Sequence, residues 1–215
     1  MIEDACIDLS HYQTFVDFNV VHRAGIKLVI HKATEGTKST DARYATRESL
    51  ARSVGLAWGA YHFMRTSSGA EQAEHFLRVV RPKPGALCVI DLEAAWTDSA
   101  QFFDQAEVWC ARVEAVTEVP VLLYSTAAYL KDVPAGSTLC ERPLWIARYP
   151  VTHGVEAKAY SKSLRVGTIP PPWKDSTLLW QYTSKGAVPG IGGNVDRNVG
   201  DVDSVIARYP GCATT

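Results

Sequence analysis

The sequence predicts an α/β fold, a single barrel in which five strand–helix units are closed by three less regular strands. Apolar strand-like runs recur up to about residue 125, and segments with helical periodicity lie between them. Such alternation is typical of βαβ units and a parallel sheet. Beyond residue 125 the strand-like runs continue without long helices between them. Barrels of 215 residues are commonly one unit, so we expect a single domain.

Eight strands are predicted from apolar runs. The five runs of the regular part are Ala5–Leu9, Lys27–Ala33, Leu56–Phe63, Ala86–Leu92 and Val119–Tyr124. The three later runs are Pro143–Tyr149, Thr177–Thr183 and Asn194–Val199. The segment Pro150–Ser176 contains consecutive prolines and predicts a long loop of extended character.

Helices are predicted between the strands from capping residues and from a 3.6-residue apolar period. Ser68 and Glu71 form a capping box, and the apolar face that follows is Ala73, Phe76, Leu77 and Val80. Asp98 can cap the next helix, whose apolar face is Phe102, Ala106, Trp109, Val113 and Val116. The segment Asp41–Val54 is helical in composition, with a less clear apolar face.

Composition and charge argue against several classes of protein. The net charge is −1 and no basic run is present, so we expect neither a nucleic-acid partner nor an anionic membrane surface. No apolar run approaches the ~20 residues that a transmembrane helix needs, so no membrane insertion is expected. The first residues lack the basic segment and apolar core of a signal peptide, which predicts synthesis in the cytosol without a leader.

The cysteines do not form the pattern of a secreted disulfide framework. They are Cys6, Cys88, Cys110, Cys140 and Cys212, an odd number without CxxC spacing. At least one thiol is therefore free. Cys6 and Cys88 lie within strand-like runs and are expected to be small core residues.

The stretch Cys88–Ala94 is central to the functional prediction, because an apolar strand ends there in two carboxylates. Side chains alternate along a strand, so Asp91 and Glu93 point to the same side, with Cα atoms roughly 6.6 Å apart. Carboxylates are rarely buried unless they are paired or used. Two at the end of an apolar run favour an acid/base site of the kind that glycoside hydrolysis requires. The alternative is a strand end that meets solvent, with both acids hydrated.

Two further acids are expected at the same rim. In parallel barrels the reacting groups lie at the carboxyl ends of the strands, and Asp8 and Asp196 occupy such ends here. Crowded carboxylates cannot all ionise cheaply, so at least one pKa must rise, as a general acid near neutral pH requires. We assign that role to Glu93, which has the longer arm. Asp8, Asp91 and Asp196, kept ionised, would stabilise the oxocarbenium-like charge.

Candidate substrate-binding residues also fall at strand ends, where aromatic side chains offer flat faces to sugar rings or, alternatively, cap the core. The expected set is Tyr61, Tyr124, Trp145, Gln181, Tyr182, Lys32 and Glu35. No metal site is expected, because the histidines show no HExxH or other ligand spacing. The stereochemical outcome stays open, because ~6.6 Å lies between the ~5–5.5 Å of retaining enzymes and the larger separations of inverting ones.

Seven short blocks carry a family resemblance. They are Ile7–Gln13, Lys32–Gly36, Gly59–Phe63, Ile90–Glu93, Leu144–Tyr149, Trp180–Thr183 and Gly193–Asn198. In this order they resemble glycoside hydrolase family 25, the Chalaropsis-type lysozymes, from about residue 5 to residue 199. Tyr12 departs from the family pattern, since a tryptophan or another residue is frequent there, and Arg197 replaces a commoner apolar residue.

The resemblance implies a TIM-like (β/α)5(β)3 barrel, with residues 1–215 as one catalytic domain and no separate wall-binding domain. It implies hydrolysis of the β-1,4 bond between N-acetylmuramic acid and N-acetylglucosamine in peptidoglycan, whose glycan strands are the expected partner of a monomeric enzyme. Glu93 would be the proton donor, with Asp8, Asp91 and Asp196 as the remaining acids. Asp91 would act either as nucleophile or by orienting the substrate's acetamido group. No metal or organic cofactor is implied.

The lack of a signal peptide and of wall-binding repeats suits a phage endolysin that reaches the wall through a holin-type pore, and a bacterial enzyme with another exit route is the alternative. Two other functions are compatible with a groove of this kind. One is a glycan-binding barrel without catalysis, and the other is a metal-dependent peptidoglycan deacetylase or amidase.

Overall fold

The structure is a computed structural model that describes residues 1–149 and 168–213. Its strands are β1 Glu3–Leu9, β2 Leu28–Glu35, β3 Ser39–Thr40, β4 Ala57–Phe63, β5 Leu87–Leu92, β6 Leu122–Thr126, β7 Leu144–Ala147, β8 Thr177–Gly186 and β9 Val195–Gly200. Its α-helices are α1 Phe18–Arg23, α2 Tyr44–Ser53, α3 Gly69–Val80, α4 Ser99–Thr117, α5 Ala127–Leu130 and α7 Val202–Arg208. Short 3-10 helices are η1 Thr138–Glu141, η2 Trp173–Asp175 and η3 Pro210–Cys212.

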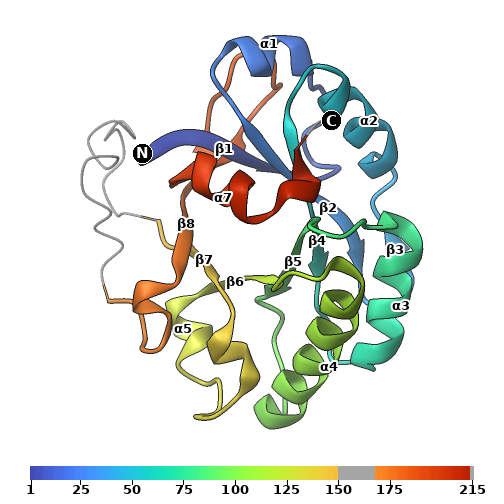
Figure 1. Cartoon of the computed structure of the whole chain (residues 1–215), viewed down its shortest axis with the longest axis vertical. Coiled ribbons are helices and arrows are strands. Elements are labelled where there is room, and N and C mark those ends of the chain that lie inside the picture. The colour runs from blue at the N-terminus through green and yellow to red at the C-terminus, as the bar shows by residue number, and fades with distance from the viewer. Residues whose placement is uncertain (150–167, 214–215) are drawn as a thin grey trace.

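The strands close into a barrel of eight, and the two-residue β3 is attached outside it to β2. Around the barrel the order is β1, β2, β4, β5, β6, β7, β8 and β9, and β9 pairs with β1 to complete the circle. β9 is antiparallel to both of its neighbours, whereas the other barrel pairings are parallel. Figure 1 shows α3 and α4 side by side on the outside of the barrel.

The predicted barrel of five strand–helix units and three further strands is confirmed. Each of β1, β2, β4, β5 and β6 is followed by a helix, and β7, β8 and β9 complete the circle. The prediction missed α1, α5 and α7, which are too short for an apolar period to be visible, and also β3. Of the predicted loop Pro150–Ser176, residues 150–167 lie outside the described part, and its end forms η2.

Local capping explains where the two long helices begin. The Ser68 hydroxyl accepts a hydrogen bond from the backbone N–H of Glu71 at 3.3 Å, and the Asp98 carboxylate accepts one from Gln101 at 3.0 Å. Both predicted N-caps are therefore confirmed, and each satisfies a backbone donor that the helix leaves unpaired. The predicted apolar face of α4 is buried except at Val116, which is exposed because it lies on the solvent side of the last turn.

Alternation along the strands divides the core into two layers. Residues such as Ile7, Ile90 and Ile146 point outward and pack under the helices. Residues such as Leu28 and Val89 point into the barrel, together with Val205 of α7. Helix α7 packs at the amino end of β1, so apolar side chains fill this end of the barrel. The polar residues that point into the barrel lie at its opposite end.

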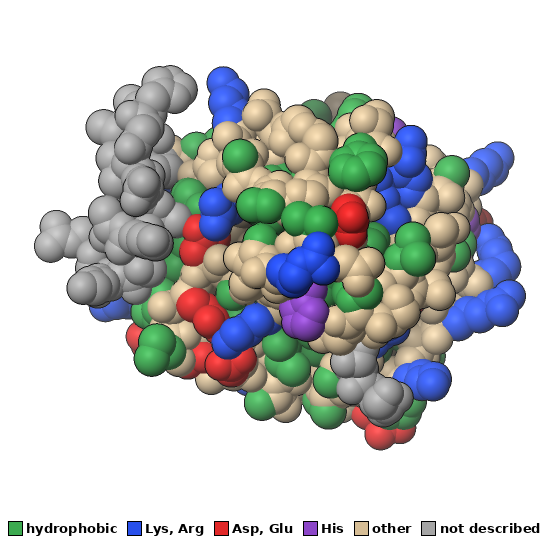
Figure 2. Space-filling model, turned by 90° about the horizontal axis from the view of Figure 1, so that it is seen from above, with side chains coloured by type: hydrophobic (Ala, Val, Ile, Leu, Met, Phe, Trp, Pro, Cys, Tyr) green, Lys and Arg blue, Asp and Glu red, His purple; other side chains and the backbone are tan. Residues whose placement is uncertain are grey.

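The surface and the cysteines agree with the composition. Cys6 and Cys88 are buried in the core as predicted, and all five cysteines are free thiols. On the face shown in Figure 2, Lys and Arg side chains stand at several separate places, with Asp and Glu side chains near some of them. None of the helices in the described ranges has the length and apolarity to cross a bilayer.

Candidate active site

A cavity of about 390 Å³ opens at the end of the barrel opposite α7. Its lining is dominated by charged and aromatic side chains from all eight barrel strands and from loops that follow them. The lining residues are Asp8, Ser10, Tyr12, Lys32, Glu35, Tyr61, Phe63, Arg65, Asp91, Glu93, Tyr124, Trp145, Tyr149, Gln181 and Asp196. All four acids predicted for catalysis are therefore brought together.

Strand register explains how acids so distant in sequence meet. Asp8, near the end of β1, pairs with Asp196 at the start of β9. Because β9 is antiparallel, its beginning lies at the rim where the parallel strands end, which corrects the expectation that Asp196 sits at a carboxyl end. On the other side of the barrel, Asp91 pairs with Tyr124, and Tyr124 pairs with Trp145. The side chains of these residues then share one level inside the barrel.

Asp8 is held by a network of buried amides. Its Oδ2 accepts hydrogen bonds from Gln181 Nε2 and Asn198 Nδ2, each at 2.9 Å. The indole Nε1 of Trp145 donates to Asn198 Oδ1 at 2.7 Å, and because an indole N–H can only donate, the Asn198 amide is oriented with its NH2 toward Asp8. The hydroxyl of Tyr124 donates to Gln181 Oε1 at 2.9 Å. The position of the Asp8 carboxyl is thus fixed before any ligand binds.

Asp91 is buried without comparable support. Its Oδ1 has no hydrogen-bond partner among the described residues. Burial raises the pKa of Asp91 well above its usual range, and Glu93 adds to this rise while the Lys32 ammonium opposes it. A buried carboxyl oxygen without a donor is costly, and the Asp91 side chain lines a cavity from which a ligand could supply one.

Glu93 lies just beyond β5 and, unlike Asp91, is exposed to solvent. The backbone at this point is anchored, because the Ser125 hydroxyl donates to the carbonyl of Leu92 at 2.6 Å and the Tyr129 hydroxyl donates to the carbonyl of Glu93. Desolvation by the surrounding protein atoms raises the pKa of Glu93, and Lys32 opposes the rise. The carboxyl is therefore both accessible and biased toward its protonated form.

The sequence predicts a raised pKa for Glu93 and ionised forms of the other three acids, but in the structure the pKa values of Asp8 and Asp196 are raised as well. Burial raises the pKa of Asp8 well above its usual range, with Asp196 adding to it and the amide donors opposing it. Burial also raises the pKa of Asp196 to about 6, although its own backbone N–H opposes the rise. Four carboxyls share one small volume, so the ionisation of one raises the pKa of its neighbours.

This crowding predicts that Asp196→Asn stabilises the protein at neutral pH. A carboxyl whose pKa is raised in the folded state does not lower the free energy of unfolding at pH values below its unfolded pKa of 3.8. It lowers that free energy by the full amount above its folded pKa of about 6. Folding stability should therefore fall between these two pH values in the wild type and fall less in the variant, with an upper bound of about 3 kcal/mol. We expect thermal unfolding to show a higher Tm for Asp196→Asn at about pH 7.5.

The gain should shrink toward zero at about pH 4, where the carboxyl is protonated in both folded and unfolded states. Asp104→Asn, at an exposed position of α4, is the matched control and should leave Tm almost unchanged at both pH values. A gain of equal size at both pH values would contradict the electrostatic cause.

Most predicted substrate-binding residues line the cavity, but one does not. Tyr61, Tyr124, Trp145, Gln181, Lys32 and Glu35 all belong to the lining. Tyr182 does not, because it follows Gln181 on β8 and neighbouring residues of a strand face opposite sides. Its hydroxyl instead donates to Asp4 Oδ2 at 2.8 Å, and Arg197 pairs with the same carboxylate at 2.7 Å. Arg197 therefore lies outside the cavity.

Some lining residues were missed because they lie beyond the ends of strands. Tyr12 is 78% exposed and Tyr149 50% exposed, so these rings offer more open surface than the buried Tyr124 and Trp145. Arg65 follows β4 and lies at the rim. The family-like blocks around Tyr12 and Tyr149 were the available signal for two of them, and no sequence signal marked Arg65.

His62, which belongs to the family-like block Gly59–Phe63, is a buried core histidine. Its ring stacks on Trp109 and bonds Thr34 at 2.7 Å and Gln72 at 3.1 Å. Burial lowers the pKa of His62 to about 4, so the ring is neutral. Within residues 1–149 and 168–213, no three His, Cys, Asp or Glu side chains are grouped so as to hold a metal ion.

Comparison with known proteins places this cavity in a family context. The sequence pattern of the family described as "Glycosyl hydrolases family 25" matches residues 7–191 of this chain. Lysozyme M1 of Streptomyces globisporus is 31% identical over 207 residues, which cover 89% of this chain and 66% of that protein. The autolytic lysozyme of Clostridium acetobutylicum is 30% identical over 191 residues, covering 88% of this chain and 53% of the relative. The chain thus spans between half and two thirds of the length of these two relatives.

A solved structure agrees with these sequence matches. The muramidase from Trichobolus zukalii superposes on this chain with a TM-score of 0.78, at 27% sequence identity. The match covers 95% of this chain and 98% of the muramidase. The whole described barrel therefore has a counterpart in that solved structure.

Proposed function

The chain belongs to the glycosyl hydrolases of family 25, and on that premise we propose that it is a lysozyme. The proposed reaction is hydrolysis of the β-1,4 bond between N-acetylmuramic acid and N-acetylglucosamine in bacterial peptidoglycan. The observation that carries this proposal is the meeting of Asp8, Asp91, Glu93 and Asp196 in one cavity that is also lined by aromatic rings. The names of the relatives, lysozyme and muramidase, support the same substrate.

Glu93 is the proposed general acid. It donates its proton to the glycosidic oxygen as the bond from that oxygen to C1 of the muramic acid breaks, so that the leaving N-acetylglucosamine departs as a neutral alcohol. Its exposure allows contact with a bound glycan, and its raised pKa keeps the proton available. The remaining acids supply negative charge toward the oxocarbenium-like carbon.

Asp91 is the proposed partner of the reacting carbon or of the acetamido group beside it. As nucleophile it would bond to C1, and water would later release the sugar. In the other route it would accept a hydrogen bond from the acetamido N–H, while the acetamido oxygen attacks C1. The unpartnered Oδ1 supports the second route, because an amide N–H from the substrate would complete its hydrogen bonding.

The remaining lining residues are proposed to bind the glycan strand. Tyr61, Gln181, Lys32 and Glu35 present polar atoms to the cavity, and the open rings of Tyr12 and Tyr149 can stack on sugars. Trp145 and Tyr124 act through the network that holds Asp8. We propose residues 1–215 as one catalytic domain that works as a monomer at the bacterial wall. Release through a membrane pore stays a prediction.

Release of reducing ends tests this proposal against both alternatives. Purified protein incubated with peptidoglycan should generate new reducing sugar ends at the same rate with and without EDTA. Release of acetate or of a new amine without new reducing ends, abolished by EDTA, would favour the metal-dependent deacetylase or amidase. Binding of the glycan without any new reducing end would favour a barrel that has lost catalysis.

A further inference from the structure

We propose that Arg65 selects substrates that carry a free carboxylate near the cleaved bond, an inference that rests on the proposed lysozyme function. Among the residues that the structure describes, five acids and two cations, Lys32 and Arg65, line the cavity. A neutral glycan needs neither cation for charge pairing. The two cations differ in access, since the Lys32 side chain is 14% exposed and the Arg65 side chain is 52% exposed.

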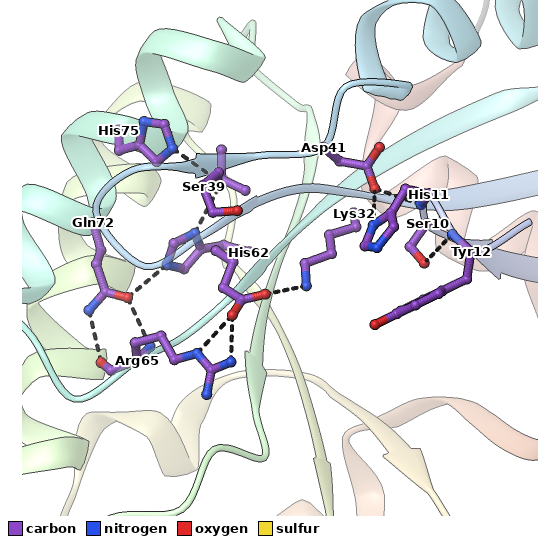
Figure 3. Close-up of polar contacts among 12 residues, drawn as sticks. Ser10, His11, Tyr12, Lys32, Ser39, Asp41, His62, Arg65, Gln72 and His75 are labelled. Atoms are coloured by element: carbon purple, nitrogen blue, oxygen red, sulfur yellow. Dashed lines mark hydrogen bonds and ion pairs between the residues drawn. The ribbon is translucent and has the colours of Figure 1, made fainter.

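The charges around Arg65 do not cancel. Glu35 Oε2 accepts from Lys32 Nζ at 2.5 Å, and Glu35 Oε1 accepts from Arg65 Nε at 2.9 Å. One carboxylate therefore serves two cations, and the cluster of Lys32, Glu35 and Arg65 retains a net charge of about +1. Figure 3 shows this chain of contacts between Lys32 and Arg65. Lys32 also lowers the pKa of Asp91 and of Glu93, whereas Arg65 acts on Glu35, so Arg65 is the less compensated of the two cations.

The backbone of Arg65 is held in place before a ligand arrives. Its N–H donates to Gln72 Oε1, and its carbonyl accepts from Gln72 Nε2, both at 2.9 Å. Gln72 itself is fully buried on α3 and also contacts His62. Figure 3 shows the Gln72 amide clamped against Arg65 in this way. A side-chain amide thus fixes the start of the loop that follows β4.

The guanidinium is held as well. It lies over the ring of Phe63, 4.6 Å from the centroid, and its stem packs beside Gly36, where a Cβ would meet Arg65 Cγ at 3.4 Å. Nη1 makes no hydrogen bond to any residue in the described ranges. A preorganised, partly exposed guanidinium with an unused nitrogen is suited to bind a carboxylate at low entropic cost.

The substrate class offers such a carboxylate on one sugar only. N-acetylmuramic acid carries a lactyl ether, and its carboxyl is either free or joined by an amide bond to a peptide stem that has carboxylates of its own. N-acetylglucosamine carries none. Pairing with Arg65 would therefore fix which sugar lies on the Arg65 side of the cavity and favour charged strands over neutral ones.

The test compares glycan strands that differ in charge alone. One pair is stem-free glycan with free lactyl carboxylates and the same glycan with those groups converted to neutral amides. The other pair is stem-bearing glycan with and without amidated stem carboxylates. For each, kcat/KM is measured by reducing-end release. We expect the wild type to prefer the charged member of at least one pair by about tenfold, mostly through KM.

Arg65→Ala should reduce this preference to nearly onefold, and Arg65→Lys should retain part of it, because an ammonium keeps the charge but loses the fork of donors. If Arg65→Ala loses the preference only in the stem-free pair, the ligand of Arg65 is the lactyl carboxylate. If it loses the preference only in the stem-bearing pair, the ligand is a carboxylate of the peptide stem. Arg112→Ala is the matched control, since Arg112 pairs with exposed Glu74 away from the cavity, and it should keep the wild-type preference.

Two results would overturn the inference while leaving the lysozyme function in place. In one, the wild type cleaves charged and neutral strands equally well. In the other, Arg65→Ala, folded by circular dichroism, keeps the full wild-type preference. Failure of the wild type to cleave any of the four glycans would instead reject the proposed function itself.

Discussion

Glu93→Gln should lower the rate of reducing-end release by a factor of about 10³ or more while leaving the fold intact. Glutamine has nearly the same size and shape as glutamate, but its amide cannot transfer a proton to the glycosidic oxygen. The side chain is exposed and beyond the end of β5, so the substitution removes little packing. The Tm of the variant should therefore lie close to that of the wild type.

The pH dependence of the rate gives this prediction a second readout. A general acid must be protonated to work, so the wild-type rate should fall as pH rises through the raised pKa of Glu93. The residual activity of Glu93→Gln should lack this decline. Glu74→Gln, at an exposed position on α3, is the control and should keep both rate and pH profile. A wild-type rate in Glu93→Gln would remove Glu93 from the acid role.

Asp91→Asn should lower the rate by a factor of about 10² to 10⁴ and should not lower stability. Either proposed route needs a carboxylate at this position, for bond formation to C1 or for a strong hydrogen bond to the acetamido N–H. The side chain is buried and its Oδ1 has no donor, so the folded protein is destabilised by any charge there. A neutral amide of similar volume avoids that cost.

Activity and stability are thus expected to move in opposite directions at Asp91, as at other catalytic groups held in unfavourable surroundings. Paired measurements of kcat and Tm at about pH 7.5 check this. A variant that loses activity only because it unfolds would show a marked drop in Tm, and that result would contradict the assigned role. Asp104→Asn again serves as the control for a solvent-exposed aspartate.

The main features of the barrel and of its acids were predictable from the sequence because both follow from periodicity. The alternation in Cys88–Ala94 placed a carboxyl at the end of a buried strand, and the same reasoning applied to Asp8. Asp196 was placed correctly at the rim but for the wrong reason, since the antiparallel direction of β9 depends on barrel closure. Pairing direction is not visible in a single strand.

The remaining errors also have physical causes. Gln181 and Tyr182 were both assigned to the site, although adjacent residues of β8 cannot face the same side. Arg65 was missed because it belongs to a loop, and its position depends on the buried amide of Gln72 on the next helix. The pKa rise was expected at Glu93 alone, whereas the extent of burial at Asp8 and Asp91 could not be known before the barrel was closed.

Mass spectrometry of digested peptidoglycan tests the central claim most directly. After borohydride reduction, the fragments should end in reduced N-acetylmuramic acid, because cleavage by a muramidase exposes C1 of that sugar. Fragments that end in reduced N-acetylglucosamine, or that show a new amine or a severed peptide without any reducing end, would contradict the account.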